Sequence, residues 1–124
     1  MTDKKRIGAI EWRDLTVKNA TVVSDFYEKV VGWTAEPVSM GDYDDFNMSL
    51  AEDGETVAGV CHAKGVNQDI PPQWMMYVRV ANVTNSIDNV IASGGKVLSG
   101  PNTFSGDTYY VIQDPEGAVL TIFS

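Results

Sequence analysis

The chain has 124 residues, of which 44% are hydrophobic, and it carries a formal net charge of −8 at pH 7. This length corresponds to one domain with enough apolar residues for a core of its own. The acidic balance excludes nucleic acid as a main partner, because nucleic-acid affinity comes largely from cationic side chains that displace counterions from phosphates.

Cys61 is the only cysteine, so no intrachain disulfide can form and a reducing compartment is expected. The charged N-terminus is followed by Glu11, Arg13 and Asp14 rather than by a long apolar run. Neither a signal peptide nor a membrane span is therefore expected, and no membrane partner. The expected location is the cytoplasm.

The first half of the chain predicts a strand near 9–17, an amphipathic helix, and strands near 34–40, 44–50 and 56–62. Asn19 and Thr21 are suited to capping the start of the helix, and Gly32 is expected to end it in the left-handed conformation. The predicted buried helix face has three-and-four spacing and consists of Val22, Val23, Phe26, Tyr27, Val30 and Val31.

Residues 64–72 have linker composition, with the pair Pro71-Pro72 near their end. A strand near 73–80 follows, then a helix whose apolar face contains Val83, Ile87, Val90 and Ile91 and which is expected to end at Gly95. Strands near 95–98, 107–113 and 118–123 complete the chain, with the turn 114–117 before the last of them.

The second half repeats the first at an offset of 63 residues. Leu15–Thr21 matches Val78–Thr84 in its alternating pattern, and Gly32 matches Gly95. Each half therefore reads as strand, helix and three strands. The expected modules span about 7–63 and 73–124 of a single domain, 1–124. Neither copy can cover its own sheet, so the two are expected to share one core.

Several segments resemble one family. The run 26–33, FYEKVVGW, is similar to its "FYxxvxGW" helix end, and 114–118, DPEGA, to its "DPeGa" turn. The "W-x-D/E-L" opening at Trp12–Leu15 and the "WxxYxxV" strand at Trp74–Val80 most resemble its poorly characterised single-domain members. The chain thus resembles the vicinal oxygen chelate superfamily, which includes glyoxalase I, extradiol dioxygenases and bleomycin-resistance proteins. The resemblance implies an α+β fold of two tandem βαβββ modules with curled mixed sheets enclosing a cavity, and a homodimer.

The family's divalent metal is held by four side chains on the first and last strands of both modules. The resemblance places these positions at Trp12, Met75, Thr121 and either Ala58 or Gly59. None of them offers the imidazole, carboxylate or thiolate that such metals need. No metal cofactor is therefore expected, with a site of displaced ligands such as Asp14, Glu11 and His62 left as an alternative.

Strand alternation divides each strand between a helix-covered face and a cavity face. Leu15 and Val17 are assigned to the first helix, and Met76, Val78 and Val80 to the second. The predicted ligand-binding residues face the cavity: Trp12, Asp14, Thr16, Met75, Tyr77, Arg79, Tyr109, Gln113 and Thr121. Phe46, Met48 and Val111 are assigned to the same side.

Asp14 and Arg79 are the candidate catalytic residues. A carboxylate on a concave face is costly to bury without a partner or a task, and Arg79 is the expected partner. The pair can be a structural ion pair, Asp14 can simply reach solvent, or Asp14 can bind ligand or act as general acid or base. His62 is interpreted as an edge-strand residue rather than a ligand, and Cys61 as a buried, inert thiol.

The first hypothesis is a metal-independent protein that binds a small, partly apolar organic molecule. The alternative is a lyase, isomerase or dioxygenase-like enzyme that uses Asp14 as acid or base, with Arg79 or Tyr77 steadying an oxyanion, or that uses a non-standard metal site. The residues leave the ligand, and the choice between binding and catalysis, open.

Overall fold

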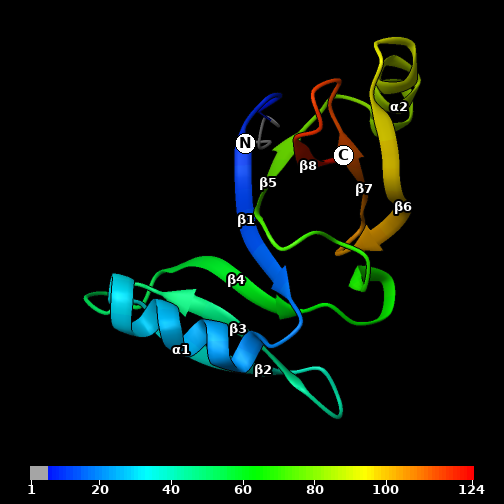
Figure 1. Ribbon diagram of the computed structural model, residues 1–124. Coiled ribbons are helices and arrows are strands. Elements are labelled where there is room, and N and C mark those ends of the chain that lie inside the picture. Colours follow the sequence, from blue (N-terminus) through cyan, green and yellow to red (C-terminus); the bar gives the residue numbers. More distant parts are fainter. Residues whose placement is uncertain (1–5) are drawn as a thin grey trace. The chain divides into compact units, whose positions relative to one another are not determined.

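The computed structural model describes residues 6–124, and the chain divides into two compact units (Figure 1). One unit is Arg13–Trp74. The other joins Met75–Ser124 to the N-terminal residues up to Trp12. The first strand, β1 (Ile10–Val17), begins in the second of these units and ends in the first.

The unit Arg13–Trp74 contains one four-stranded mixed sheet and one helix. After β1 come α1 (Ala20–Val31), β2 (Thr34–Ser39), β3 (Asp44–Ser49), β4 (Thr56–His62) and the short 3-10 helix η1 (Gly65–Asn67). The strand order is β2-β3-β4-β1. β1 and β4 are parallel and the other pairs antiparallel, and α1 packs on β2, β3 and β4.

Helix α1 begins and ends as the sequence predicts. The side chain of Asn19 accepts a hydrogen bond from the Val22 N–H at 3.1 Å. Gly32 has φ +87° and donates its N–H to the Glu28 carbonyl at 3.1 Å. The left-handed conformation at this position favours glycine, because glycine has no Cβ that would clash with the backbone.

The buried face of α1 is narrower than predicted. Ala20 and Ser24 are buried, and Val23 and Tyr27 pack against the core. Four of the six predicted core residues are instead exposed, namely Val22, Phe26, Val30 and Val31. Neighbouring residues of a helix point about 100° apart, so the adjacent pairs 22–23 and 26–27 cannot both face the sheet.

The core beneath α1 is built on Ala20, Met48, Ala58 and Val60, with aromatic rings around them. The Trp74 ring lies 5.3 Å from Tyr27 and 5.8 Å from Trp33, and its indole N–H donates to the Tyr27 hydroxyl at 3.1 Å.

The assignment of Phe46 and Met48 to a cavity face was wrong, because both belong to this core. Phe46 pairs with Val60 and Met48 with Ala58, and paired residues of neighbouring strands share a face.

The second unit repeats the pattern with β5 (Trp74–Arg79), α2 (Val83–Ala92), β6 (Lys96–Phe104), β7 (Asp107–Gln113) and β8 (Val119–Phe123). The strand order is β5-β8-β7-β6, with β5 and β8 parallel. N-terminal residues lie along β5: the Gly8 N–H donates to the Arg79 carbonyl at 2.7 Å, and the Arg79 N–H to the Ala9 carbonyl at 2.9 Å.

Helix α2 starts as α1 does but ends differently. The Asn82 side chain accepts from the Asn85 N–H at 3.1 Å. The left-handed residue after the helix is Gly94, with φ +90°, and not the predicted Gly95. Gly95 is needed for a different reason, because a Cβ there would lie 2.7 Å from the Gln113 carbonyl oxygen.

The core beneath α2 contains Val83, Ile112 and Ile122, with Val80 packed against it as predicted. Met76 was also predicted to lie here, but it is 44% exposed. The predicted α+β class with two βαβββ copies is confirmed, and the main difference in bounds is that β6 continues to Phe104. None of the helices in 6–124 has the length and apolar character needed to cross a membrane.

Candidate functional site

The sheet face opposite α2 brings together several predicted site residues. Tyr77 pairs with Thr121 and Arg79 with Phe123 across β5 and β8, while Tyr109 pairs with Phe123 across β7 and β8. Paired residues share a face. We call this surface the β5–β8–β7 face; its members are Tyr77, Arg79, Tyr109, Val111, Thr121 and Phe123.

Arg79 is the charged centre of the β5–β8–β7 face. Its Nε–H and Nη2–H groups donate to the two carboxylate oxygens of Glu11 at 2.6 and 3.1 Å. Nη2 also lies 3.8 Å from an oxygen of Asp107, and the guanidinium carbon lies 4.5 Å from the Phe123 ring centre. This two-pronged pairing fixes the plane of the guanidinium.

Sequence reasoning missed Glu11 as the carboxylate that holds Arg79. It proposed Asp14, and the Asp14–Arg79 pairing stays a prediction. The start of β1 lies next to Arg79, because the Arg79 N–H donates a hydrogen bond to the carbonyl of Ala9, the residue just before β1. The only signal for this in the sequence was a carboxylate among the residues just before Trp12.

Two polar atoms of the β5–β8–β7 face are buried without a hydrogen-bond partner among residues 6–124: Arg79 Nη1 and Thr121 Oγ1. Such groups are nearly always paired in folded proteins, since burying them unpaired costs about 1–3 kcal/mol. They mark positions at which a polar atom of a bound molecule would be stabilised.

The remaining predicted residues of this unit have varied settings. The Tyr77 and Tyr109 rings lie 6.4 Å apart and are tilted by 55°. Met75 is buried and Trp12 is half-buried. The Gln113 amide donates to the Gly117 carbonyl at 3.2 Å, so this side chain holds the predicted turn 114–117.

In the unit Arg13–Trp74, Asp14 and Thr16 share the face opposite α1 with Gly59 and Cys61. The register pairs Asp14 with Gly59 and Thr16 with Cys61. Ala58 lies beneath α1. The resemblance placed one metal position at either Ala58 or Gly59. Of these two residues, Gly59 is the one on the same face as Asp14.

The donor set at the four metal positions does not fit a divalent cation. Trp12, Met75 and Gly59 have no ligating group, and Thr121 offers a single neutral hydroxyl. Across the described part of the chain, no group of three His, Cys, Asp or Glu side chains is placed to hold a metal ion.

The prediction that His62 lies on an edge strand was wrong, because β4 runs between β3 and β1. Its backbone N–H donates to the Asp45 carboxylate at 2.8 Å, and its Nδ1 lies 3.6 Å from the same oxygen. The imidazole packs edge-on against Tyr43, with ring centres 5.4 Å apart.

Burial raises the pKa of the Cys61 thiol above its ordinary value of 9.0, and the charges of Asp14 and Asp45 add to this shift. A thiol with a raised pKa stays protonated and is a poor nucleophile at neutral pH. The described setting of Cys61 therefore favours the inert thiol expected from the sequence.

Titration of Cys61 gives a testable pH dependence of stability. Because its pKa is higher in the folded than in the unfolded chain, its contribution is fully present below about pH 9 and is lost as pH rises. The expected slope approaches about 1.4 kcal/mol per pH unit above the unfolded pKa. Urea unfolding of the parent and of Cys61→Ala from about pH 8 to 10 measures the difference. Two curves that stay parallel would contradict this assignment.

The family model for the Glyoxalase/Bleomycin resistance protein/Dioxygenase superfamily matches residues 6–122. The chain therefore belongs to this superfamily.

Among curated proteins, CFP32 of Mycobacterium tuberculosis (strain CDC 1551 / Oshkosh), provisionally named a glyoxylase, is 30% identical over 123 residues, covering 95% of this chain and 46% of CFP32. The anthracycline biosynthesis protein DnrV of Streptomyces peucetius is 29% identical over 132 residues, covering 94% of this chain and 46% of DnrV. The chain spans about half the length of these relatives.

Solved structures show the same fold. A superfamily member from Vibrio splendidus 12B01 superposes with a TM-score of 0.58 at 11% identity, covering 90% of this chain and 95% of its own. Methylmalonyl-CoA epimerase from Mycobacterium tuberculosis gives a TM-score of 0.55 at 10% identity, covering 99% and 91%. At such low identity the likeness concerns the fold alone.

Proposed function

We propose that this chain binds a small, partly apolar organic molecule on the β5–β8–β7 face and does so without a metal. The observation that carries the proposal is the pair of buried, unpaired polar atoms, Arg79 Nη1 and Thr121 Oγ1, on a face that also presents Tyr77 and Tyr109. Apolar walls with a few convergent polar groups are typical of small-molecule sites.

The ligand should carry a hydrogen-bond acceptor. Arg79 Nη1 can only donate, whereas the Thr121 hydroxyl can donate or accept. Glu11 and Asp107 already surround the guanidinium with two carboxylates. An uncharged acceptor such as a carbonyl or hydroxyl oxygen is therefore favoured over a carboxylate, which would add a third negative charge.

Replacement of Thr121 by valine tests the proposal through two opposite effects. Thr121→Val keeps the shape but removes a fully buried unpaired hydroxyl, so the free protein should be more stable by about 1 kcal/mol. Ligands found in a thermal-shift screen of small organic compounds should bind the variant about fivefold to tenfold more weakly by calorimetry.

Thr103→Val is the matched control, because Thr103 is exposed on β6. It should change neither stability nor affinity. Ligands that bind Thr121→Val as tightly as the parent would refute the proposed site. Elemental analysis after exposure to nickel, zinc, iron and manganese tests the metal-independent part, and stoichiometric metal would overturn it.

An enzyme that uses Asp14 as general acid or base is the second candidate. The observation in its favour is that Asp14 lies half-buried on the sheet face opposite α1, near enough to Cys61 for its charge to raise the pKa of that thiol. Asp14→Asn should then keep ligand affinity while any turnover seen in the parent is lost. Unchanged turnover would assign Asp14 a structural role.

We also propose a homodimer in the cytoplasm. The dimer rests on family resemblance, and the location on the lone Cys61. Sedimentation that shows only monomer at micromolar concentration would contradict the dimer.

A further inference from the structure

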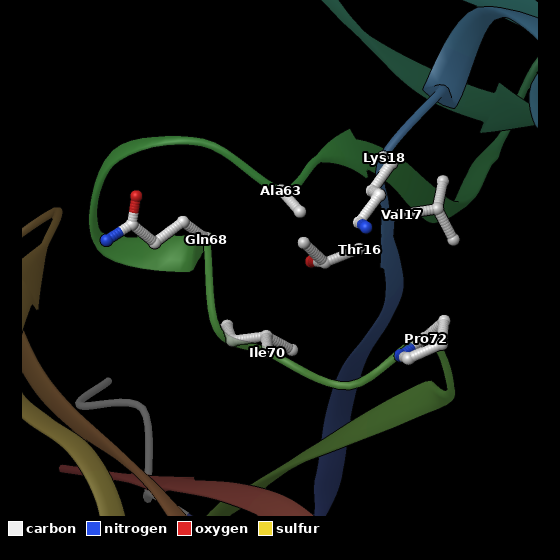
Figure 2. Close-up of a pocket in the computed structure, with 7 residues that line it drawn as sticks. All are labelled: Thr16, Val17, Lys18, Ala63, Gln68, Ile70 and Pro72. Carbon is white, nitrogen blue, oxygen red and sulfur yellow. The ribbon is translucent and has the colours of Figure 1, made fainter.

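The unit Arg13–Trp74 contains a hollow of about 310 Å³ beside the end of β1. It lies between β1 and the segment that connects β4 to β5 (Figure 2). The hollow is lined by Thr16, Val17, Lys18, Ala63, Gln68, Ile70 and Pro72. Its volume is at the lower end of the range for small-molecule sites, so it suits a ligand with one ring or a short chain.

The side chains divide the hollow into an apolar body and one polar corner. Ala63, Ile70 and Pro72 supply the apolar surface. Figure 2 shows the Thr16 hydroxyl directed into the hollow. Lys18, which is exposed and follows the last residue of β1, lines the same hollow two residues further along the chain. The Gln68 amide and the Val17 side chain point away.

The wall opposite β1 is held by backbone hydrogen bonds, two within the segment and one to β1. The N–H of Gln68 donates to the Gly65 carbonyl at 3.2 Å, that of Ile70 to the Asn67 carbonyl at 3.2 Å, and that of Ala63 to the Val17 carbonyl at 2.8 Å. Pro72 has a restricted φ. A wall fixed in this way loses little conformational freedom when a ligand binds.

We propose that this hollow is a binding site for small monocarboxylates with a compact apolar body. Among the described residues that line it, Lys18 is the only charged one, and none is a carboxylate. The ammonium would hold the carboxylate, the Thr16 hydroxyl would donate a hydrogen bond to it, and the apolar body would contact Ile70 and Pro72. The chain's net charge of −8 opposes an anion only weakly at physiological salt, where charges beyond about 8 Å are screened. The site uses none of the residues of the β5–β8–β7 face.

Benzoate, with benzamide as its uncharged analogue of the same size, tests this proposal on the full chain. Benzoate should bind with a Kd of about 1 mM, as expected for so small a ligand. Amide chemical shifts should move at Thr16, Ala63 and Ile70, and benzamide should bind more weakly. No saturable benzoate binding, or shifts confined to other residues, would overturn the proposal.

Lys18→Gln removes the charge at an exposed position and keeps most of the side-chain length. It should weaken benzoate binding about threefold to fivefold and leave benzamide unchanged. Lys96→Gln makes the same change in net charge at an exposed residue that does not line the hollow, and should change benzoate affinity by less than about 1.5-fold. Equal effects of the two substitutions would show a general charge effect and refute the site.

Discussion

Met48→Ala should lower the free energy of unfolding by about 2–5 kcal/mol. Met48 has no exposed surface and packs in the core beneath α1 with Ala58 and Val60. Truncation removes three heavy atoms from that core and leaves a cavity that the surrounding strands cannot fully close. Chemical denaturation followed by tryptophan fluorescence measures the change, because Trp33 and Trp74 border the same core.

Met76→Ala is the natural control, because the same residue type is 44% exposed there. It should change stability by about 0.5 kcal/mol or less. Met48→Leu, which nearly conserves volume, should cost less than about 1.5 kcal/mol. Equal losses for the two alanine variants would mean that the side of β3 on which Met48 lies has been misassigned.

Gly95→Ala should destabilise the protein by about 1–3 kcal/mol. A Cβ at this position would meet the Gln113 carbonyl oxygen at 2.7 Å, a Val90 methyl at 3.0 Å and the Val90 carbonyl oxygen at 3.2 Å. Two of these contacts are backbone atoms, so α2 or β7 must shift to relieve them. Thermal unfolding of the variant measures the loss.

Gly94→Ala separates steric contact from backbone strain. Gly94 has φ +90°, but a Cβ there would meet only Pro115, at ordinary contact distances of 3.8 and 3.9 Å. Its cost should be about 1–2 kcal/mol, from the left-handed conformation alone. Gly94→Asn should cost less than Gly94→Ala, because asparagine tolerates this conformation better than alanine does. If Gly95→Asn were likewise milder than Gly95→Ala, a steric origin at that position would be contradicted.

The sequence was sufficient to predict elements that depend on local rules. Asn19, the predicted cap, and Asn82, at the matching position of the repeat, each accept a backbone N–H three residues later, and the turn 114–117 follows from the Asp-Pro-Glu-Gly order. The internal repeat then ordered these elements into two copies of one unit. The first conclusion rests on short-range geometry and the second on comparing one half of the chain with the other, and a single sequence contains the information for both.

The errors concern which side of an element is covered. Alternation separates the two faces of β3 but does not say which one lies beneath α1, and the register with β4 places Met48 there. Likewise, α1 has more apolar residues than one helix face can hold, so the sequence does not show which of them are buried. Arg79 is held by the carboxylate of Glu11, at the start of β1. The two residues are far apart in the sequence, so no local pattern predicts that they pair.

The crossing of β1 between the two units affects how related proteins could be recombined. Gly8, Ala9 and Glu11 all bond to Arg79, although the repeat assigns them to the first copy. A chimaera joined in the segment 64–72 would separate Arg79 from its native neighbours. Exchange of the second copy between relatives would therefore need to carry the residues before Trp12 along with it.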